Sequence, residues 1–180
     1  MKKIMIIATG WVCLLVLASI VYVAWPWLSL LTGIHSLPNP TRPSIIYGEF
    51  PFRLEYELNG TRMVIEDKLI CEFDGFGADE GRGKYRKWNQ RLASGSKSII
   101  LLKLCETKEI EFVPGSAEYY MGDSGSSKND SSFPNAIIIS RDGRFTTESG
   151  IRAEQLLKQY NIKLLNWNGS QPITNNFSGE

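Results

Sequence analysis

The chain is short of the residues on which many metal and hydrolytic sites depend. Its 180 residues include one histidine and three cysteines. One imidazole excludes a zinc site built on several histidines, and three cysteines are too few for a disulfide scaffold. The 20 basic side chains nearly balance the 19 acidic ones, which is not the charge of a nucleic-acid-binding polycation. We therefore expect no cofactor, no metal and no nucleic-acid partner.

Charge is absent from residues 4–41. Within this stretch residues 4–25 also lack proline, and a helix of that length, rising about 1.5 Å per residue, crosses a hydrocarbon layer of about 30 Å. Tyr22, Trp25 and Trp27 gather at its far end, and such rings favour the headgroup region of a membrane. The sequence therefore predicts that residues 4–25 span a lipid bilayer, with these aromatic residues at the membrane interface.

Positive charge predicts the orientation of this helix. Lys2 and Lys3 precede it, which favours a cytoplasmic N-terminus and an extracytoplasmic body at the cell membrane. A cleaved signal peptide is the alternative, because residues 16–18 could pass as a cleavage site. The apolar run continues to Trp25, however, whereas a signal-peptide core has about 7–15 residues. The sequence favours an uncleaved, single-pass anchor.

Composition divides the chain into four parts. Residues 1–27 are the expected membrane anchor, and residues 28–43 form an interfacial, proline-rich linker. Within it, residues 28–34 either lie at the membrane interface or extend the helix past a kink, and residues 37–43 are expected to be extended. Residues 44–167 carry the pattern of one globular domain. Residues 168–180 are polar, and we expect them to form a flexible tail.

Alternation of apolar and polar residues predicts a sheet in the body. Phe52–Leu58 alternates strictly, and Asn59-Gly60 is typical of a type I′ turn that leads into a second strand at residues 61–65. Residues 151–160 have the period of an amphipathic helix, and Asn161 is placed to cap its C-terminal end. Further strands are expected at residues 69–73, 98–104, 109–113, 118–121, 136–140 and 162–167.

The order of these elements predicts the fold class. Strand, helix and strand follow one another over residues 136–167, which indicates one right-handed crossover appended to the sheet. The expected class is α+β: an N-terminal transmembrane helix, then a mainly antiparallel β-sheet domain with a C-terminal strand–helix–strand unit.

A glycine-rich segment at residues 74–83 contains three acidic side chains, Asp74, Asp79 and Glu80. It fits neither a helix–loop–helix calcium site nor a phosphate-binding loop. Its glycines are typical of a loop with positive φ angles. The alternative is a binding or catalytic loop in which two of these carboxylates act as general acid and base.

The next segment is basic and aromatic, with the candidate binding residues Lys84, Tyr85, Arg86, Lys87 and Trp88. On a helix, its aromatic residues would form one stripe with Leu92. The stripe could pack on the sheet and leave the cations in water. Alternatively the cations could bind an anionic envelope polymer, a lipid headgroup or a protein partner.

Two weaker patterns remain. Gly122-Asp-Ser-Gly125 matches the nucleophile motif of trypsin-like proteases, but it lies in a serine-rich loop and no suitable histidine base is present, so we expect no catalytic residue there. Cys71 and Cys105 fall in predicted strands, and an extracytoplasmic location would permit a disulfide between them, although buried thiols are also common.

Several segments carry a resemblance to known proteins: residues 47–52, 71–75, 83–88 and 115–122. Together they resemble single-pass, membrane-anchored proteins of Gram-positive bacteria, a group without an assigned activity. The resemblance implies a location at the cell envelope and a bacterial host, and it implies no catalytic residue.

These patterns favour binding or assembly at the cell surface over catalysis. The unusual residues cluster at positions 74–91, and the sequence shows no catalytic triad. A small hydrolase that uses paired carboxylates of the glycine-rich segment is one alternative. A structural subunit of a membrane complex is another.

Overall fold

The computed structural model describes residues 2–96, 98–123 and 131–177. The chain forms two compact units. One contains Met1–Pro40 and Phe76–Arg86, and the other contains Thr41–Gly75 and Lys87–Glu180.

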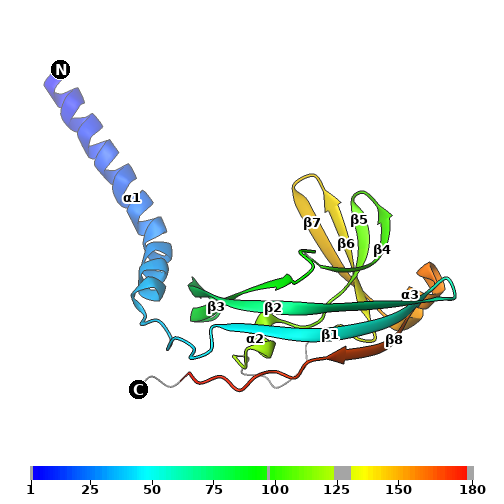
Figure 1. Cartoon of the computed structure of the whole chain (residues 1–180). Helices are drawn as coiled ribbons and strands as arrows, with labels where there is room; N and C mark the ends of the chain where they lie inside the picture. Colours follow the sequence, from blue (N-terminus) through cyan, green and yellow to red (C-terminus); the bar gives the residue numbers. More distant parts are fainter. Residues whose placement is uncertain (1, 97, 124–130, 178–180) are drawn as a thin grey trace. The chain divides into compact units, whose positions relative to one another are not determined.

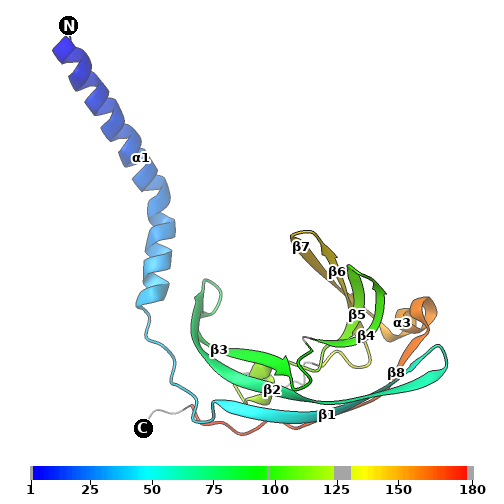
Figure 2. The ribbon, with the colours of Figure 1, turned by 45° about the horizontal axis from the view of Figure 1, so that its top comes forward.

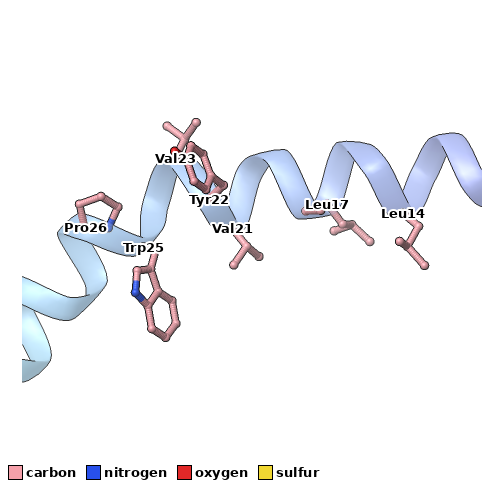
Figure 3. Close-up of a pocket in the computed structure, with 8 residues that line it drawn as sticks. Leu14, Leu17, Val21, Tyr22, Val23, Trp25 and Pro26 are labelled. Atoms are coloured by element: carbon pink, nitrogen blue, oxygen red, sulfur yellow. The ribbon is translucent and has the colours of Figure 1, made fainter.

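The first unit is dominated by one long apolar helix. Helix α1 runs over Lys2–Ser36, well beyond the expected end of the anchor, and includes Pro26 (Figure 1). Leu14–Ile34 is long and apolar enough to cross a membrane, and none of it is buried in the protein. Figure 3 shows Leu17, Val21 and Trp25 projecting from the helix into open space.

Three hydroxyl groups of α1 are satisfied by the helix itself. The hydroxyls of Ser19, Thr32 and Ser36 each donate to the carbonyl four residues earlier, at 2.8, 2.7 and 2.8 Å. These three hydroxyls need no water as an acceptor, because each already donates its hydrogen to a carbonyl of the helix. The helix continues through residues 28–36, past Pro26, which is one of the two alternatives that the sequence left open for residues 28–34.

The second unit contains two four-stranded sheets. The first has the order β3-β2-β1-β8, and strands β2 and β3 run on into the other unit. Its strands are β1 (Tyr47–Leu58), β2 (Thr61–Asp79), β3 (Gly83–Leu92) and β8 (Ile162–Gly169). The expected hairpin is confirmed, because Leu58 pairs with Thr61 across Asn59 and Gly60, whose φ angles are 53° and 80°.

The second sheet is an antiparallel meander with the order β4-β5-β6-β7. Its strands are β4 (Ile99–Cys105), β5 (Lys108–Phe112), β6 (Ala136–Asp142) and β7 (Phe145–Ile151). Figure 2 shows this sheet beside the longer strands of the first one.

The core lies between the sheets and two short helices. Helices α2 (Ala117–Tyr120) and α3 (Ala153–Tyr160) contribute Tyr120 and Leu156 to it. The Trp167 ring of β8 joins the two sheets, since its centroid lies 5.3 Å from that of Phe52 and 4.7 Å from that of Phe112. Rings of this size dominate the energetics of a small core.

The coarse fold prediction is confirmed: an apolar N-terminal helix precedes mainly antiparallel sheets, with a helix and a strand near the C-terminus. The expected crossover is wrong, because β6 and β8 belong to different sheets and β7 was missed. The expected strand at residues 118–121 is also wrong, since α2 occupies most of it. Asn161 does cap α3, with a φ angle of 54°.

Residues 173–176 of the C-terminal segment are hydrogen-bonded to the domain. Ile173 N–H donates to the Tyr120 carbonyl at 2.9 Å. The Asn175 amide bonds to both backbone groups of Ile45, at 3.0 and 2.8 Å, and Ser44 N–H donates to the Asn176 carbonyl at 3.1 Å. These bonds attach the end of the chain to the start of the domain.

Candidate functional site: the β2–β3 hairpin

The glycine-rich and basic segments are the two strands of one hairpin. Residues 74–79 continue β2, residues 80–82 form the turn and residues 83–92 form β3, so the expected helix is wrong and the expected loop shrinks to this turn. The positive φ angles expected of its glycines occur at Gly75 and Gly83, at 83° and 70°. A strand alternates its side chains between two faces, whereas a helix gathers those three or four residues apart. The aromatic stripe inferred from helical spacing therefore does not form.

Asp79 holds the turn of this hairpin. Its Oδ1 accepts the backbone N–H groups of Gly81 and Arg82 at 3.0 and 2.7 Å, and its Oδ2 pairs with the Arg82 guanidinium at 2.9 Å. The hydrogen bond from the Arg82 backbone is the main cause that lowers the pKa of the Asp79 carboxyl. A carboxylate held ionised in this way is a poor general acid. Glu80, beside it, is exposed.

Tyr85 closes one face of the hairpin tip. The Arg82 guanidinium lies 3.9 Å from the centroid of its ring, within the range of a cation–π contact. The ring lies so close to Gly77 that a Cβ there would come within 2.4 Å of it. Gly77 is therefore needed for close packing. Lys84 and Arg86, on either side of Tyr85 in sequence, are half-buried.

The same tip contacts the chain just after α1. Gly83 has a φ angle of 70°, and a Cβ built on it would lie 3.5 Å from a methyl group of Leu37. Leu37 follows the last residue of α1 directly. The hairpin tip and the end of the apolar helix thus belong to one compact unit.

At the base of the hairpin, in the other unit, opposite charges are paired. Lys87 binds Asp74 at 2.9 Å, and Arg91 binds Glu72 at 3.0 Å. These are exposed pairs, each worth about 0–1 kcal/mol. They nevertheless compensate two of the cations that suggested an anionic partner.

Trp88 packs inside the domain at the base of the hairpin. Its Nε1 donates to Asp123 Oδ2 at 2.7 Å, and its ring meets Phe73 edge to face with centroids 5.5 Å apart. Asp123 belongs to the protease-like tetrapeptide, whose Ser124 and Gly125 lie outside the described residues, as does most of the serine-rich loop. The indole is therefore bonded and packed within the domain.

Sequence reasoning missed a buried ionic cluster in the second sheet. Glu109 and Glu111 on β5 face Arg141 on β6, and their side chains are 9% and 10% exposed. Arg141 hydrogen-bonds Glu109, and its Nη2 lies 3.5 Å from Glu111 Oε1. The alternation around Ile110 had predicted a buried isoleucine, and it is buried, but gave no sign that both neighbours would be buried too.

The two carboxyls of this cluster have opposite electrostatic environments. The hydrogen bond from Arg141 lowers the pKa of Glu109, while desolvation raises the pKa of Glu111. Glu111 also lines a cavity of about 150 Å³ together with Ser98 and Gln90. A cavity of that size holds small groups or water. Glu111 lines it, but Glu109 does not.

The two strand cysteines do not form the disulfide that the sequence allowed. Both thiols are free; Cys71 is fully buried and Cys105 is exposed. Burial raises the pKa of Cys71 to about 12. The hydrogen bond with the Thr107 side chain lowers the pKa of Cys105. Their different accessibility makes Cys105 the reactive one of this pair.

The remaining predicted residues lie on α1. Tyr22, Trp25 and Trp27 are 82%, 64% and 63% exposed, so most of each side chain does not pack against the protein. Over the described residues, no group of three or more His, Cys, Asp or Glu side chains could hold a metal ion. Comparisons of the chain with protein-family models, with curated proteins and with solved structures gave no match.

Proposed function

We propose that this protein is a single-pass membrane protein that presents its two-sheet domain outside the membrane for assembly with a protein partner. The observation that carries the proposal is the apolar segment Leu14–Ile34 of α1, in which no described residue is buried. In water, such a surface would be costly at about 25 cal/mol per Å² of apolar area. A lipid bilayer is the environment in which that cost is removed.

The lysines at the start of α1 and the hydroxyl groups within it support the membrane assignment. Lys2 and Lys3 precede the apolar run, which favours a cytoplasmic N-terminus. The hydroxyls of Ser19 and Thr32 are bonded within the helix, as polar groups in a hydrocarbon layer must be. Because the apolar segment extends to Ile34, the bilayer would also enclose residues beyond Trp25.

Assembly is favoured over hydrolysis by the contacts of the candidate carboxylates. Asp79 is fixed in a turn and Asp74 is paired with Lys87. The pKa of Asp79 is lowered, chiefly by the hydrogen bond from the Arg82 backbone, whereas a general acid requires a raised pKa. These carboxylates therefore serve the fold of the hairpin, and its tip belongs to the same compact unit as α1.

Retention in membranes tests the anchor. In membranes from cells that express the full chain, the protein should remain in the pellet after extraction with alkaline carbonate. Leu17→Arg places a charge within the apolar segment at a cost of about 2.5–3.5 kcal/mol and should release much of it. Leu37→Arg, just beyond α1, is the matched control and should be retained. Release of the unaltered chain, or loss of its N-terminal segment by cleavage, would contradict the proposal.

A further inference from the structure

The tip of the β2–β3 hairpin, residues 76–86, contacts the chain where the apolar helix ends. A Cβ built on Gly83 would lie 3.5 Å from a methyl group of Leu37, and both segments belong to one compact unit. Leu37 is fixed to the last turn of α1, because its N–H donates to the Ile34 carbonyl at 3.3 Å. Ile34 is also the last residue of the apolar segment. The hairpin tip is therefore held next to the end of that segment.

The dimensions of α1 bring this contact to a membrane surface. The helix has 35 residues and is about 52 Å long, whereas a bilayer with its headgroups is about 40–45 Å thick. Leu37 follows Ile34 by three residues, about 5 Å along a helix, and each headgroup layer is about 5–8 Å thick. With Lys2 and Lys3 at the cytoplasmic headgroups, α1 is long enough to carry Leu37 to the opposite headgroup layer.

The charges of the tip fit an anionic lipid surface. Asp79 and Arg82 pair with each other, and the remaining charges of the tip are those of Lys84 and Arg86 against Glu80. Lys84 and Arg86 lie on one face of β3, because side chains two residues apart share a face of a strand. Lys84 forms no ion pair in the part of the chain that the structure describes. Basic side chains beside a membrane are attracted to the headgroups of anionic lipids.

Tyr85, between these two basic residues, has a side chain of the kind that favours a headgroup layer, with an apolar ring and a polar hydroxyl. The cations at the base of the hairpin differ from those of the tip. Lys87 and Arg91 are paired with acidic side chains, at 2.9 and 3.0 Å. The excess positive charge of the hairpin therefore lies at its tip, which is the part that adjoins the end of α1.

We infer that the hairpin tip lies in the outer headgroup layer of the membrane and binds anionic lipid headgroups through Lys84 and Arg86. The inference rests on the anchor proposed above, since the tip reaches a membrane surface only if α1 spans the bilayer. It gives the protein a second contact with the bilayer, and this contact depends on lipid charge. Salt should weaken it, because screening shortens the range of the attraction.

A fluorophore at the tip of the full-length chain tests this placement. Glu80→Cys provides an exposed thiol in the turn, in a chain that also carries Cys13→Ala and Cys105→Ser, while Cys71 is buried. The labelled protein is reconstituted in bilayers of phosphatidylcholine and phosphatidylglycerol. In separate samples, one of the two lipids carries a nitroxide close to its headgroup, which quenches fluorescence only at short range. We expect quenching by both nitroxide lipids, and stronger quenching by the phosphatidylglycerol nitroxide.

Two variants of Lys84 test the role of charge. Lys84→Gln should lower the preference for phosphatidylglycerol by about fivefold, the usual contribution of one basic residue at an anionic surface. Lys84→Glu should lower it further, because it adds repulsion. Lys163→Gln and Lys163→Glu, the same changes at an exposed position of β8, are the matched controls and should leave the preference unchanged.

Failure of the anchor and failure of the tip contact give different results. Release of the unaltered chain by alkaline carbonate would contradict the anchor and this inference with it. A retained chain whose fluorophore is quenched by neither lipid would overturn the placement of the tip. Equal quenching by the two lipids, or a preference that persists in both Lys84 variants, would overturn the binding of anionic headgroups. The Lys84 variants should keep the far-UV circular dichroism of the unaltered chain, which separates lost binding from unfolding.

Discussion

Arg141 is the residue on which the buried charge of the second sheet depends. It lies against both Glu109 and Glu111, whose side chains are nearly inaccessible. Without it, two buried carboxylates would face each other in a medium of low dielectric. Favourable pairing keeps the pKa of Glu109 low, whereas Glu111 already has a raised pKa through desolvation.

Arg141→Met, which keeps most of the apolar stem, should lower the free energy of unfolding at pH 7.5 by about 1–3 kcal/mol. The pKa of Glu109, now lowered in the folded state, gives stability that is lost as pH falls. In the variant both carboxyls should have raised pKa values. The cost of burying their charges therefore lowers the stability at neutral pH and disappears as the carboxyls are protonated. The deficit measured by urea denaturation should therefore shrink at pH 4.5.

The matched control for this variant is Arg144→Met, which removes the same charge from the exposed turn of the same hairpin. It should have little effect on stability at either pH, since surface substitutions usually remain within about 0.5 kcal/mol. An Arg141→Met deficit of equal size at pH 7.5 and pH 4.5 would show that lost packing, and not uncompensated charge, is the cause.

Residue-level predictions succeeded where the local backbone decides the outcome. Asn59-Gly60 and Asn161 were placed correctly, because positive φ angles are a property of the residue itself. Glu109 and Glu111 were not recognised, because their burial depends on Arg141, 32 and 30 residues away.

At the scale of elements, the β2–β3 hairpin could not be predicted from the sequence pattern. Period alone could not distinguish a helix from a strand over residues 84–92, because its apolar residues fit a helical stripe equally well. The glycines that suggested a loop instead allow Tyr85 to cover Gly77 and let Gly83 leave the turn. Pairing with a neighbouring strand decided the element, and that information is not local.

The hydrogen bonds of the C-terminal segment could likewise not be predicted from its polar composition, because their partners are distant in the sequence. Asn175→Ala removes two hydrogen bonds to the backbone of Ile45, at 3.0 and 2.8 Å. We expect a loss of about 1–2 kcal/mol in the free energy of unfolding and faster hydrogen exchange at the Ile45 amide. Asn166→Ala, an exposed position on β8, is the control and should change neither. Unchanged exchange at Ile45 in Asn175→Ala would mean that the segment is not held there in solution.

At the scale of the whole molecule, the average charge composition conceals two different parts of the chain. The nearly equal numbers of basic and acidic residues conceal the uncharged stretch at residues 4–41, whereas in the domain acids and bases pair along the strands. The apolar helix could be predicted because length and composition suffice for it. The division of the strands into two sheets could not, because it depends on which distant strands pair.

The accessibility of Cys105 tests the central claim most directly. Its exposed thiol, with a lowered pKa, should react readily with a membrane-impermeant maleimide, while Cys71 is buried and has a pKa of about 12. In intact spheroplasts that express the full chain, we predict labelling that Cys105→Ser abolishes. Labelling of Cys105 only after the membrane has been permeabilised would place the domain inside the cell and contradict the account.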